Sequence, residues 1–235
     1  MQSRWTARFR CDEQAKCATV WRHSLITIYP VLATLAAYLL GSLSFAVIVS
    51  RAMGLSDPRT FGSKNPGATN VLRSGSKPAA IATLVLDGVK GWLPVALVGW
   101  YGAPYGLEDG TIALVGLAAF LGHLYPVFFK FVGGKGVDTA LGVLLGIHPL
   151  LGLAALLTWL LVALVFRFSS LASLAATALA PVVYVLGSGG AWYSETPVLI
   201  SVCVMAALLF YRHRENIVRL FNGKESRLGK GKKTA

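Results

Sequence analysis

The sequence predicts an all-α polytopic membrane protein with seven transmembrane helices. Of its 235 residues, 55% are hydrophobic and 14% are charged, and its mean hydropathy is +0.62. The apolar residues come in long continuous runs, and not in the alternating pattern of half-buried strands. Runs of about 20 apolar residues match the ~30 Å hydrocarbon core of a bilayer. A soluble domain of this length would need far less apolar sequence.

Six apolar blocks follow one another along the chain. The block at 138–166 is interrupted by Gly146-Ile147-His148-Pro149, and a proline ends or kinks a helix, so this block forms either one span or two. The blocks are 25–49, 79–101, 111–129, 138–166, 169–186 and 197–211.

The basic residues favour seven spans over six. Cytoplasmic loops of membrane proteins carry an excess of Lys and Arg. With seven spans the N-terminus lies outside and the C-terminus in the cytoplasm, although the basic residues of the N-terminal tail then lie outside as well. The segments that share the cytoplasmic side in this arrangement are 57–77, 130–135, Arg167 and the tail from Arg212.

Three segments make up the predicted domain organisation. Residues 1–24 form a polar N-terminal extension for which we expect disorder, residues 25–212 the seven-helix membrane domain, and residues 213–235 a basic cytoplasmic tail. The net charge of +12 reflects membrane orientation and phosphate binding, and no nucleic-acid partner is expected. The three cysteines show no CxxC or Cys/His spacing, so we predict no metal site, disulfide framework or cofactor.

The longest polar interval between apolar runs, residues 57–75, predicts a phosphate-binding loop. Its sequence, DPRTFGSKNPGATNVLRSG, combines tight-turning glycines and prolines with basic and short hydrogen-bonding side chains, and no carboxylate follows Asp57. That composition suits an oxyanion such as phosphate. The alternative is a Gly/Asn turn with incidental basic residues. The candidate phosphate-binding residues of this loop are Ser63, Asn65, Gly67, Thr69, Asn70 and Arg73.

A second candidate phosphate loop is Gly133-Gly134-Lys135-Gly136, directly before an apolar block. Backbone N–H groups, a helix dipole and the ammonium of Lys135 can act together on an anion there. The loop lacks the GxxxxGK[ST] spacing and the preceding strand of a P-loop. The alternative is an ordinary glycine turn on the basic side of the membrane.

Two further polar segments are predicted at the same membrane surface. Arg167-Phe168-Ser169-Ser170 either contacts phosphate through Arg167 and Ser169, or anchors the membrane by charge with a serine cap on the next helix. The segment 212–216 follows the last span and is either part of the site or a stop-transfer tail. Asp87 and Lys90 lie three residues apart within one span and predict a buried structural pair.

Two classes of chemistry find no support in the sequence. There is no Asp-rich cluster for Mg²⁺, which argues against metal-assisted phosphotransfer. There is also no Gly-x-Ser-x-Gly motif with a partner histidine, which argues against a serine acyl-enzyme.

Together these segments resemble the bacterial membrane glycerol-3-phosphate acyltransferases of the acyl-phosphate-dependent (PlsY) type. The resemblance implies seven helices with the N-terminus outside, in the bacterial inner membrane, with the active site facing the cytoplasm. It implies transfer of a fatty acyl group from acyl phosphate to the 1-hydroxyl of sn-glycerol 3-phosphate, an early step of phospholipid synthesis coupled to an acyl-phosphate-forming enzyme. The matching segments are GSLSFAVIVSR (41–51), GSKNPGATNVLR (62–73), LDGVKG (86–91), GHLYPVFFKFVGGKGV (122–137), RFSSLAS (167–173) and HRENIVRLFNGKE (213–225).

The resemblance also assigns residue roles. It makes Gly133, Gly134, Lys135 and Gly136 the phosphate-binding loop and places Glu225 in the family's tail motif. The general base stays open between His213, His123 and a phosphate oxygen of the substrate. Lys64 and Asp138 depart from the family pattern, which often has glycine and alanine at these positions. The predicted catalytic residues are Ser42, Lys135, His213 and Asn216.

Two other functions compete with acyl transfer. A transporter of phosphate or phosphorylated metabolites would also need basic, glycine-rich helix breaks near the membrane, but the chain shows no inverted repeat. A scaffold for lipid-synthesis enzymes would explain the hydrophobicity but not three phosphate-type segments.

Overall fold

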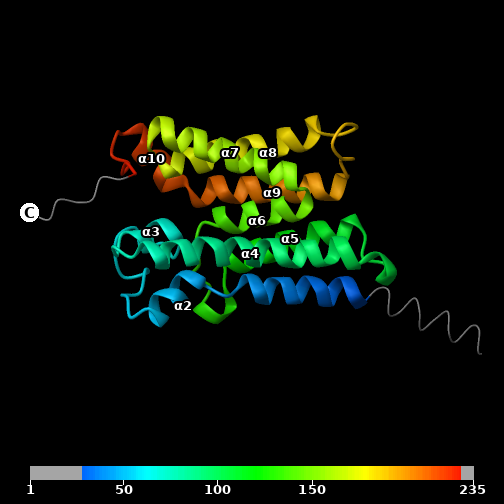
Figure 1. Ribbon diagram of the computed structural model, residues 1–235, viewed down its shortest axis with the longest axis horizontal. Helices are drawn as coiled ribbons and strands as arrows, with labels where there is room; N and C mark the ends of the chain where they lie inside the picture. Colours follow the sequence, from blue (N-terminus) through cyan, green and yellow to red (C-terminus); the bar gives the residue numbers. More distant parts are fainter. Residues whose placement is uncertain (1–27, 229–235) are drawn as a thin grey trace, which may run out of the picture.

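A computed structural model describes residues 28–228, and this range consists of helices and turns without a β-sheet. The long helices lie side by side with roughly parallel axes (Figure 1). The predicted all-α class is therefore confirmed, whereas the predicted extension 1–24 lies outside the described residues. The helices are Ile28–Gly41, α2 (Phe45–Ala52), α3 (Ala68–Leu72), α4 (Lys77–Tyr101), α5 (Asp109–Leu124), α6 (Val137–Ile147), α7 (Pro149–Phe166), α8 (Ser169–Leu186), α9 (Thr196–Arg212) and α10 (Arg214–Phe221).

The lengths of the helices bear on the number of membrane crossings. Four described helices are long and apolar enough to cross a membrane: α4, α7, α8 and the stretch Asp109–Phe129 that contains α5. Two bent pairs would raise the number to six: Ile28–Gly41 with α2, bent by 44°, and α9 with α10, bent by 57°. The 11 residues of α6 extend only ~16 Å, about half of the hydrocarbon core. Seven full crossings therefore stay a prediction.

The predicted break at His148-Pro149 is confirmed. Helix α6 ends at Ile147 and α7 begins at Pro149, whose ring suits the first position of a helix. The His148 side chain caps the new helix, because its Nδ1 accepts the N–H of Leu150 at 3.3 Å. The His148 cap and Pro149 together end α6 and start α7 at this point.

Close helix packing in the bundle depends on glycine. Gly142 of α6 lies directly against the backbone of Gly88 in α4, and Gly91 of α4 lies against the Thr139 carbonyl. Lipid surrounds apolar helices in a membrane, so close van der Waals contact across small residues is a main source of their association. The α4–α6 pair forms the most extensive helix contact of the described chain.

Apolar side chains occupy both the interior and the outside of the bundle. Val115, Phe120 and Val143 are fully buried between α5 and α6, whereas Leu164 and Leu186 are 78% exposed on the outer faces of α7 and α8. Soluble proteins rarely expose many such residues on one surface. The outer surface is therefore suited to lipid.

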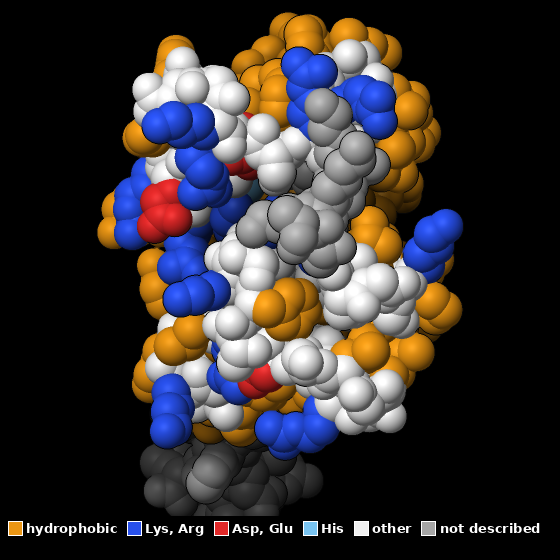
Figure 2. Space-filling view, turned by 90° about the vertical axis from the view of Figure 1, so that its left-hand side faces the viewer, with side chains coloured by type: hydrophobic (Ala, Val, Ile, Leu, Met, Phe, Trp, Pro, Cys, Tyr) orange, Lys and Arg blue, Asp and Glu red, His pale blue; other side chains and the backbone are white. Residues whose placement is uncertain are grey.

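The polar segments gather at one end of the bundle. Helices α2, α3 and α10 lie at the left-hand end in Figure 1, and the turns that join α4 to α5, α6 to α7 and α8 to α9 lie at the other. Figure 2 views the left-hand end directly and shows many Lys and Arg side chains with few Asp or Glu. This end carries the candidate active site.

The glycine contact between α4 and α6 yields a stability prediction. We expect Gly142→Ala to destabilise the protein by ~1–3 kcal/mol, because the added methyl group meets the Gly88 carbonyl. The matched control is Gly99→Ala in α4, where an added methyl group meets nothing within 4 Å. Thermal unfolding in detergent should show a lower Tm for Gly142→Ala alone, and equal Tm values would contradict tight packing of this pair.

Candidate active site

A chain of hydrogen bonds joins the glycine loop to the C-terminal segment. The Lys135 ammonium donates to Asn216 Oδ1 at 2.5 Å, and Asn216 Nδ2 donates to Glu225 Oε1 at 2.6 Å. Ser170 Oγ donates to the same carboxylate oxygen at 2.7 Å, and Arg219 Nε donates to Oε2 at 2.8 Å. The Glu225 carboxylate is therefore the point at which α8, α10 and the tail meet.

The surroundings of this network set the charges of its members. Burial lowers the pKa of Lys135 from 10.5 to about 8. Burial also opposes ionisation of Glu225, but hydrogen bonds from Arg219, Ser170 and Asn216 outweigh it and hold the pKa of Glu225 below its ordinary value. In the described part of the chain the Lys135 ammonium has one acceptor, the neutral Asn216 amide, and its other N–H donors can serve an anion.

The three glycines of the loop 133–136 lie where side chains would not fit. A side chain at Gly134 would overlap the His123 ring and come within 2.8 Å of the Pro66 carbonyl oxygen. Gly136 has φ +87°, a left-handed conformation that favours glycine, and α6 begins at the next residue. The contact with Pro66 places the two candidate phosphate loops side by side.

Asn70 holds the polar loop 57–75 together. Its Nδ2 donates to the carbonyls of Pro58 at 2.6 Å and Phe61 at 3.2 Å, and its Oδ1 accepts the N–H of Ser63 at 3.0 Å. The side chain is buried, so the amide closes the loop from inside. A direct contact of Asn70 with phosphate stays a prediction.

The other predicted residues of this loop differ in their exposure. Arg73 is exposed, and its Nη2 donates to Ser226 Oγ at 3.0 Å, which links the loop to the C-terminal segment. Thr69 is exposed on α3, Asn65 is half-buried, and Gly67 is the extended residue that precedes α3. The exposed groups are accessible to a ligand at this end of the bundle.

Lys64 adopts an uncommon backbone conformation in the same loop. Its φ is +55°, in the left-handed region that costs a non-glycine residue ~1–2 kcal/mol. This explains why glycine suits the position in the family that the sequence resembles. In this chain the strained position presents an exposed ammonium beside Ser63 and Asn65.

Two predicted residues lie away from the hydrogen-bond network. Ser42 is fully buried, and its Oγ donates to the Tyr38 carbonyl at 2.8 Å. Arg167 ends α7 with φ +63° and bonds to the tail, since its carbonyl accepts the Leu228 N–H at 2.7 Å and its guanidinium donates to the Leu228 carbonyl at 3.3 Å. These contacts are structural, and the roles in catalysis and phosphate binding stay predictions.

The alternative in which a serine caps α8 is wrong. The residue that precedes the helix is Phe168, and Ser169 is already its first helical residue, half-buried. Ser170 is the serine that reaches the Glu225 carboxylate. Sequence reasoning missed Ser170 because only the folded tail brings its partner within reach.

The Leu209 carbonyl selects one tautomer of the His213 ring. Its Nδ1 lies 2.8 Å from the Leu209 carbonyl, which can only accept, so Nδ1 carries the proton. In the neutral ring Nε2 is then the basic nitrogen. His213 is buried at the junction of α9 and α10.

The predicted pair Asp87/Lys90 is confirmed as buried. The two charged groups are 2.7 Å apart and each side chain is 1% exposed. Lys90 also donates to the Leu43 carbonyl at 2.7 Å, and His123 Nδ1 lies 3.1 Å from Thr139 Oγ1. The His123 ring stands between this buried cluster and the glycine loop.

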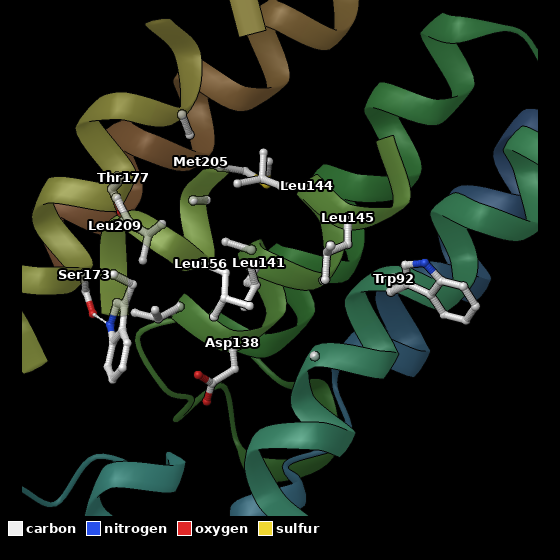
Figure 3. A pocket seen from close by; sticks show the side chains of 18 of the residues that line it. Trp92, Asp138, Leu141, Leu144, Leu145, Leu156, Ser173, Thr177, Met205 and Leu209 are labelled. Carbon is white, nitrogen blue, oxygen red and sulfur yellow. Dashed lines mark hydrogen bonds between the residues drawn. The ribbon is translucent and has the colours of Figure 1, made fainter. Parts of the chain in front are cut away.

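An apolar cavity of about 640 Å³ extends from the site between α4, α6, α7, α8 and α9. Asp138 is one of the residues that line it, together with apolar side chains such as Leu141, Leu156 and Leu209 (Figure 3). Asp138 follows Lys135 by three residues in the chain. The cavity therefore begins beside the glycine loop.

The Glu225 network yields a pH-dependent stability prediction. Glu225→Gln should lower Tm at pH 7, since hydrogen bonds to a charged group are worth about 1.5–3 kcal/mol each. The folded pKa of Glu225 lies below its unfolded value, so its charge stabilises the fold above the unfolded pKa and less as pH falls. The Tm difference from wild type should shrink in acid. The control is Glu215→Gln, because the Glu215 side chain is 75% exposed. A Tm difference for Glu225→Gln that does not change with pH would contradict the assignment of a charged Glu225.

Comparisons with known proteins agree on one family. The family model described as glycerol-3-phosphate acyltransferase matches residues 31–223. The glycerol-3-phosphate acyltransferase of Albidiferax ferrireducens is 68% identical over 211 residues, 90% of this chain and 94% of that protein, and that of Cupriavidus pinatubonensis is 58% identical over 203 residues, 86% and 98%.

Solved structures agree with the sequence relatives. The glycerol 3-phosphate form of PlsY (YgiH), an integral membrane glycerol 3-phosphate acyltransferase, has a TM-score of 0.77 and 40% identity, covering 86% of this chain and 96% of that one. Its lysophosphatidic acid form has a TM-score of 0.76 at the same identity and coverage. This chain therefore belongs to the PlsY family of glycerol-3-phosphate acyltransferases.

Proposed function

We propose that the protein transfers a fatty acyl group from acyl phosphate to the 1-hydroxyl of sn-glycerol 3-phosphate, releasing lysophosphatidic acid and inorganic phosphate. Acylation of glycerol 3-phosphate follows from the family, whereas acyl phosphate as the donor is our proposal. The observation that carries it is the contact between two phosphate-type loops at Gly134 and Pro66, next to an apolar cavity.

The pair of loops favours acyl phosphate as the donor. In acyl phosphate the phosphate is bonded directly to the acyl group, so both substrates place a phosphate near the reacting carbon. In a coenzyme A thioester the phosphates lie far from the acyl carbon and would leave one loop without a ligand. Two adjacent anion sites therefore match acyl phosphate with glycerol 3-phosphate.

The reaction needs no covalent enzyme intermediate, because acyl phosphate is already activated. The 1-hydroxyl oxygen of glycerol 3-phosphate attacks the acyl carbonyl carbon, the bond from that carbon to the phosphate oxygen breaks, and phosphate leaves with the electron pair. The hydroxyl proton goes to a base, for which His213 Nε2, His123 and a substrate phosphate oxygen are the candidates. Enzyme catalysis then consists of alignment and stabilisation of charge.

The residue roles follow from where the charged groups lie. We assign Lys135 and the amides of its loop to the phosphate on which charge develops, since this ammonium has N–H donors to spare. Arg73, the polar side chains of loop 57–75 and Lys64 attract the other phosphate from the exposed side. Asn216 orients the Lys135 ammonium from α10.

The apolar cavity is the proposed site of the acyl chain. Its lining comes from helices whose outer faces suit lipid, and Leu160 at its edge is 40% exposed. An acyl chain can therefore enter from the bilayer with its phosphate end toward Lys135. The lysophosphatidic acid product would leave the same way and remain in the membrane.

The membrane arrangement is part of the proposal. We place the protein in the bacterial inner membrane with seven crossings, the N-terminus outside and the basic site end in the cytoplasm, as positive-inside orientation favours. In the proposed domain division, residues 25–212 form the membrane domain and 213–235 the tail. An enzyme that forms acyl phosphate must supply the donor. The transporter alternative loses its basis because the family consists of acyltransferases.

The donor is tested by comparing palmitoyl phosphate, palmitoyl-CoA and palmitoyl-acyl carrier protein with the purified protein in lipidic mesophase. We expect lysophosphatidic acid to form from palmitoyl phosphate and glycerol 3-phosphate with equal release of phosphate. Transfer from a thioester alone would overturn the proposed donor while leaving the acyltransferase family intact.

Removing the Lys135 ammonium should cut turnover severely. Loss of a group that stabilises transition-state charge typically costs 10²–10³ in rate, and we expect Lys135→Ala to lose about that much kcat/KM while staying folded. Lys130→Ala removes an exposed lysine from the neighbouring segment and should retain activity. Wild-type turnover by Lys135→Ala would remove the loop from the mechanism.

The Lys135 pKa predicts an alkaline limit to activity. Lys135 keeps its charge below a pKa of about 8 and loses it above, so kcat/KM for the substrate at the loop should fall as pH rises through about 8. Substrate phosphates are already doubly ionised there, since their second pKa is about 6. The residual activity of Lys135→Arg should lack this fall, because a guanidinium stays charged. An unchanged fall in that variant would assign the limit to another group.

A further inference from the structure

Arg212, the last residue of α9, makes contacts that a membrane anchor would not need. Its Nη2 donates to the carbonyl oxygens of Gly133 at 2.8 Å and Gly134 at 2.9 Å, and its Nε donates to Gly134 at 3.2 Å. The side chain is half-buried, with the guanidinium carbon 6.0 Å from the centre of the Tyr125 ring. Arg214, two residues later, is exposed and makes no such contact with the loop.

These bonds fix the orientation of two successive peptide groups. In a planar trans peptide the C=O and N–H point in opposite directions, and the described chain has no cis peptide. The Gly133–Gly134 peptide is held at both ends, because Arg212 binds its carbonyl and the His123 carbonyl accepts its N–H at 3.2 Å. The Gly134–Lys135 peptide is held by Arg212 at its carbonyl.

The N–H of Lys135 therefore points away from the guanidinium. Among the described residues it has no hydrogen-bond acceptor, and neither has the N–H of Gly136. Both groups belong to the same loop as the Lys135 ammonium. Both backbone donors are therefore available to a ligand at this loop.

The loop needs this support because of its composition. Glycine has the largest backbone freedom of any residue, so Gly133 and Gly134 do not hold a peptide orientation by themselves. A guanidinium offers several N–H donors in a rigid planar fork and can bind two adjacent carbonyls, whereas an ammonium is a point charge on a flexible stem. The contact thus requires arginine in particular.

We propose that Arg212 is a positioning residue for acyl transfer: it holds the Gly133 and Gly134 carbonyls so that the Lys135 N–H faces the phosphate bound at the loop. The inference deepens the proposed function and rests on it for the identity of that phosphate. It gives a place in the site to Arg212, which the sequence alone leaves open between the site and a stop-transfer tail.

The test compares Arg212→Lys and Arg212→Gln with the matched controls Arg214→Lys and Arg214→Gln. For each variant, kcat and KM for both substrates, the inhibition constant of inorganic phosphate and Tm are measured on the full chain in mesophase. We expect Arg212→Lys, which keeps the charge, to lose at least about tenfold in kcat/KM and to bind inorganic phosphate several-fold more weakly. The Arg214 variants should stay within about twofold of wild type.

The contrary outcomes are distinct. Wild-type kcat/KM and phosphate inhibition in Arg212→Lys would overturn the proposal. So would failure of both Arg212 variants to fold, or a loss that disappears when rates are expressed per folded molecule, because either result assigns Arg212 to stability alone. If acyl phosphate is not the donor, wild type fails with it, while phosphate inhibition and transfer from the true donor still test Arg212.

Discussion

The hydrogen bonds from Lys135 through Asn216 to Glu225 are the interaction on which the site depends. They join a loop between α5 and α6 to α10 and the tail, segments more than 80 residues apart in sequence. Ser170 brings α8 to the same carboxylate. Because Glu225 is ionised and nearly buried, removal of any of its partners would destabilise the fold. The network therefore fixes the position of the Lys135 ammonium, to which we assign the binding of phosphate.

The loop that carries Lys135 is fixed from three sides. The His123 ring backs Gly134, the Pro66 carbonyl brings in the first phosphate loop, and Arg212 holds the carbonyls. Behind His123, the Asp87/Lys90 pair is shielded from both water and lipid. The glycines make room for these contacts, and the contacts restrict the freedom that glycine gives. The N–H groups of Lys135 and Gly136 have no acceptor among the described residues, and we propose that they face the phosphate.

The confirmed predictions concern features that depend on residues close together in the sequence. The all-α class follows from the apolar runs, the break at His148 from the proline and cap, and the pairing of Asp87 with Lys90 from their spacing. The number of full crossings stays a prediction, because α6 has only 11 residues, Val137–Ile147.

Contacts between distant segments were beyond the reach of the sequence. For Arg212 the sequence left the site and a stop-transfer tail open, because nothing near it in sequence reveals the Gly133 and Gly134 carbonyls that it binds. Ser170 was overlooked in favour of Ser169 because its partner Glu225 lies in the tail, 55 residues away in the sequence. In both cases a side chain's role is decided by a partner that only the fold supplies.

A crystal structure of the protein with glycerol 3-phosphate and a non-hydrolysable acyl phosphonate bound together would test the proposed site most directly. We expect one phosphorus group within hydrogen-bonding distance of the Lys135 ammonium and the Lys135 N–H, the other beside loop 57–75, and the acyl chain in the cavity between α4, α6 and α7. Phosphorus groups that both lie away from the glycine loop, with Lys135 still bound to Asn216 alone, would contradict it.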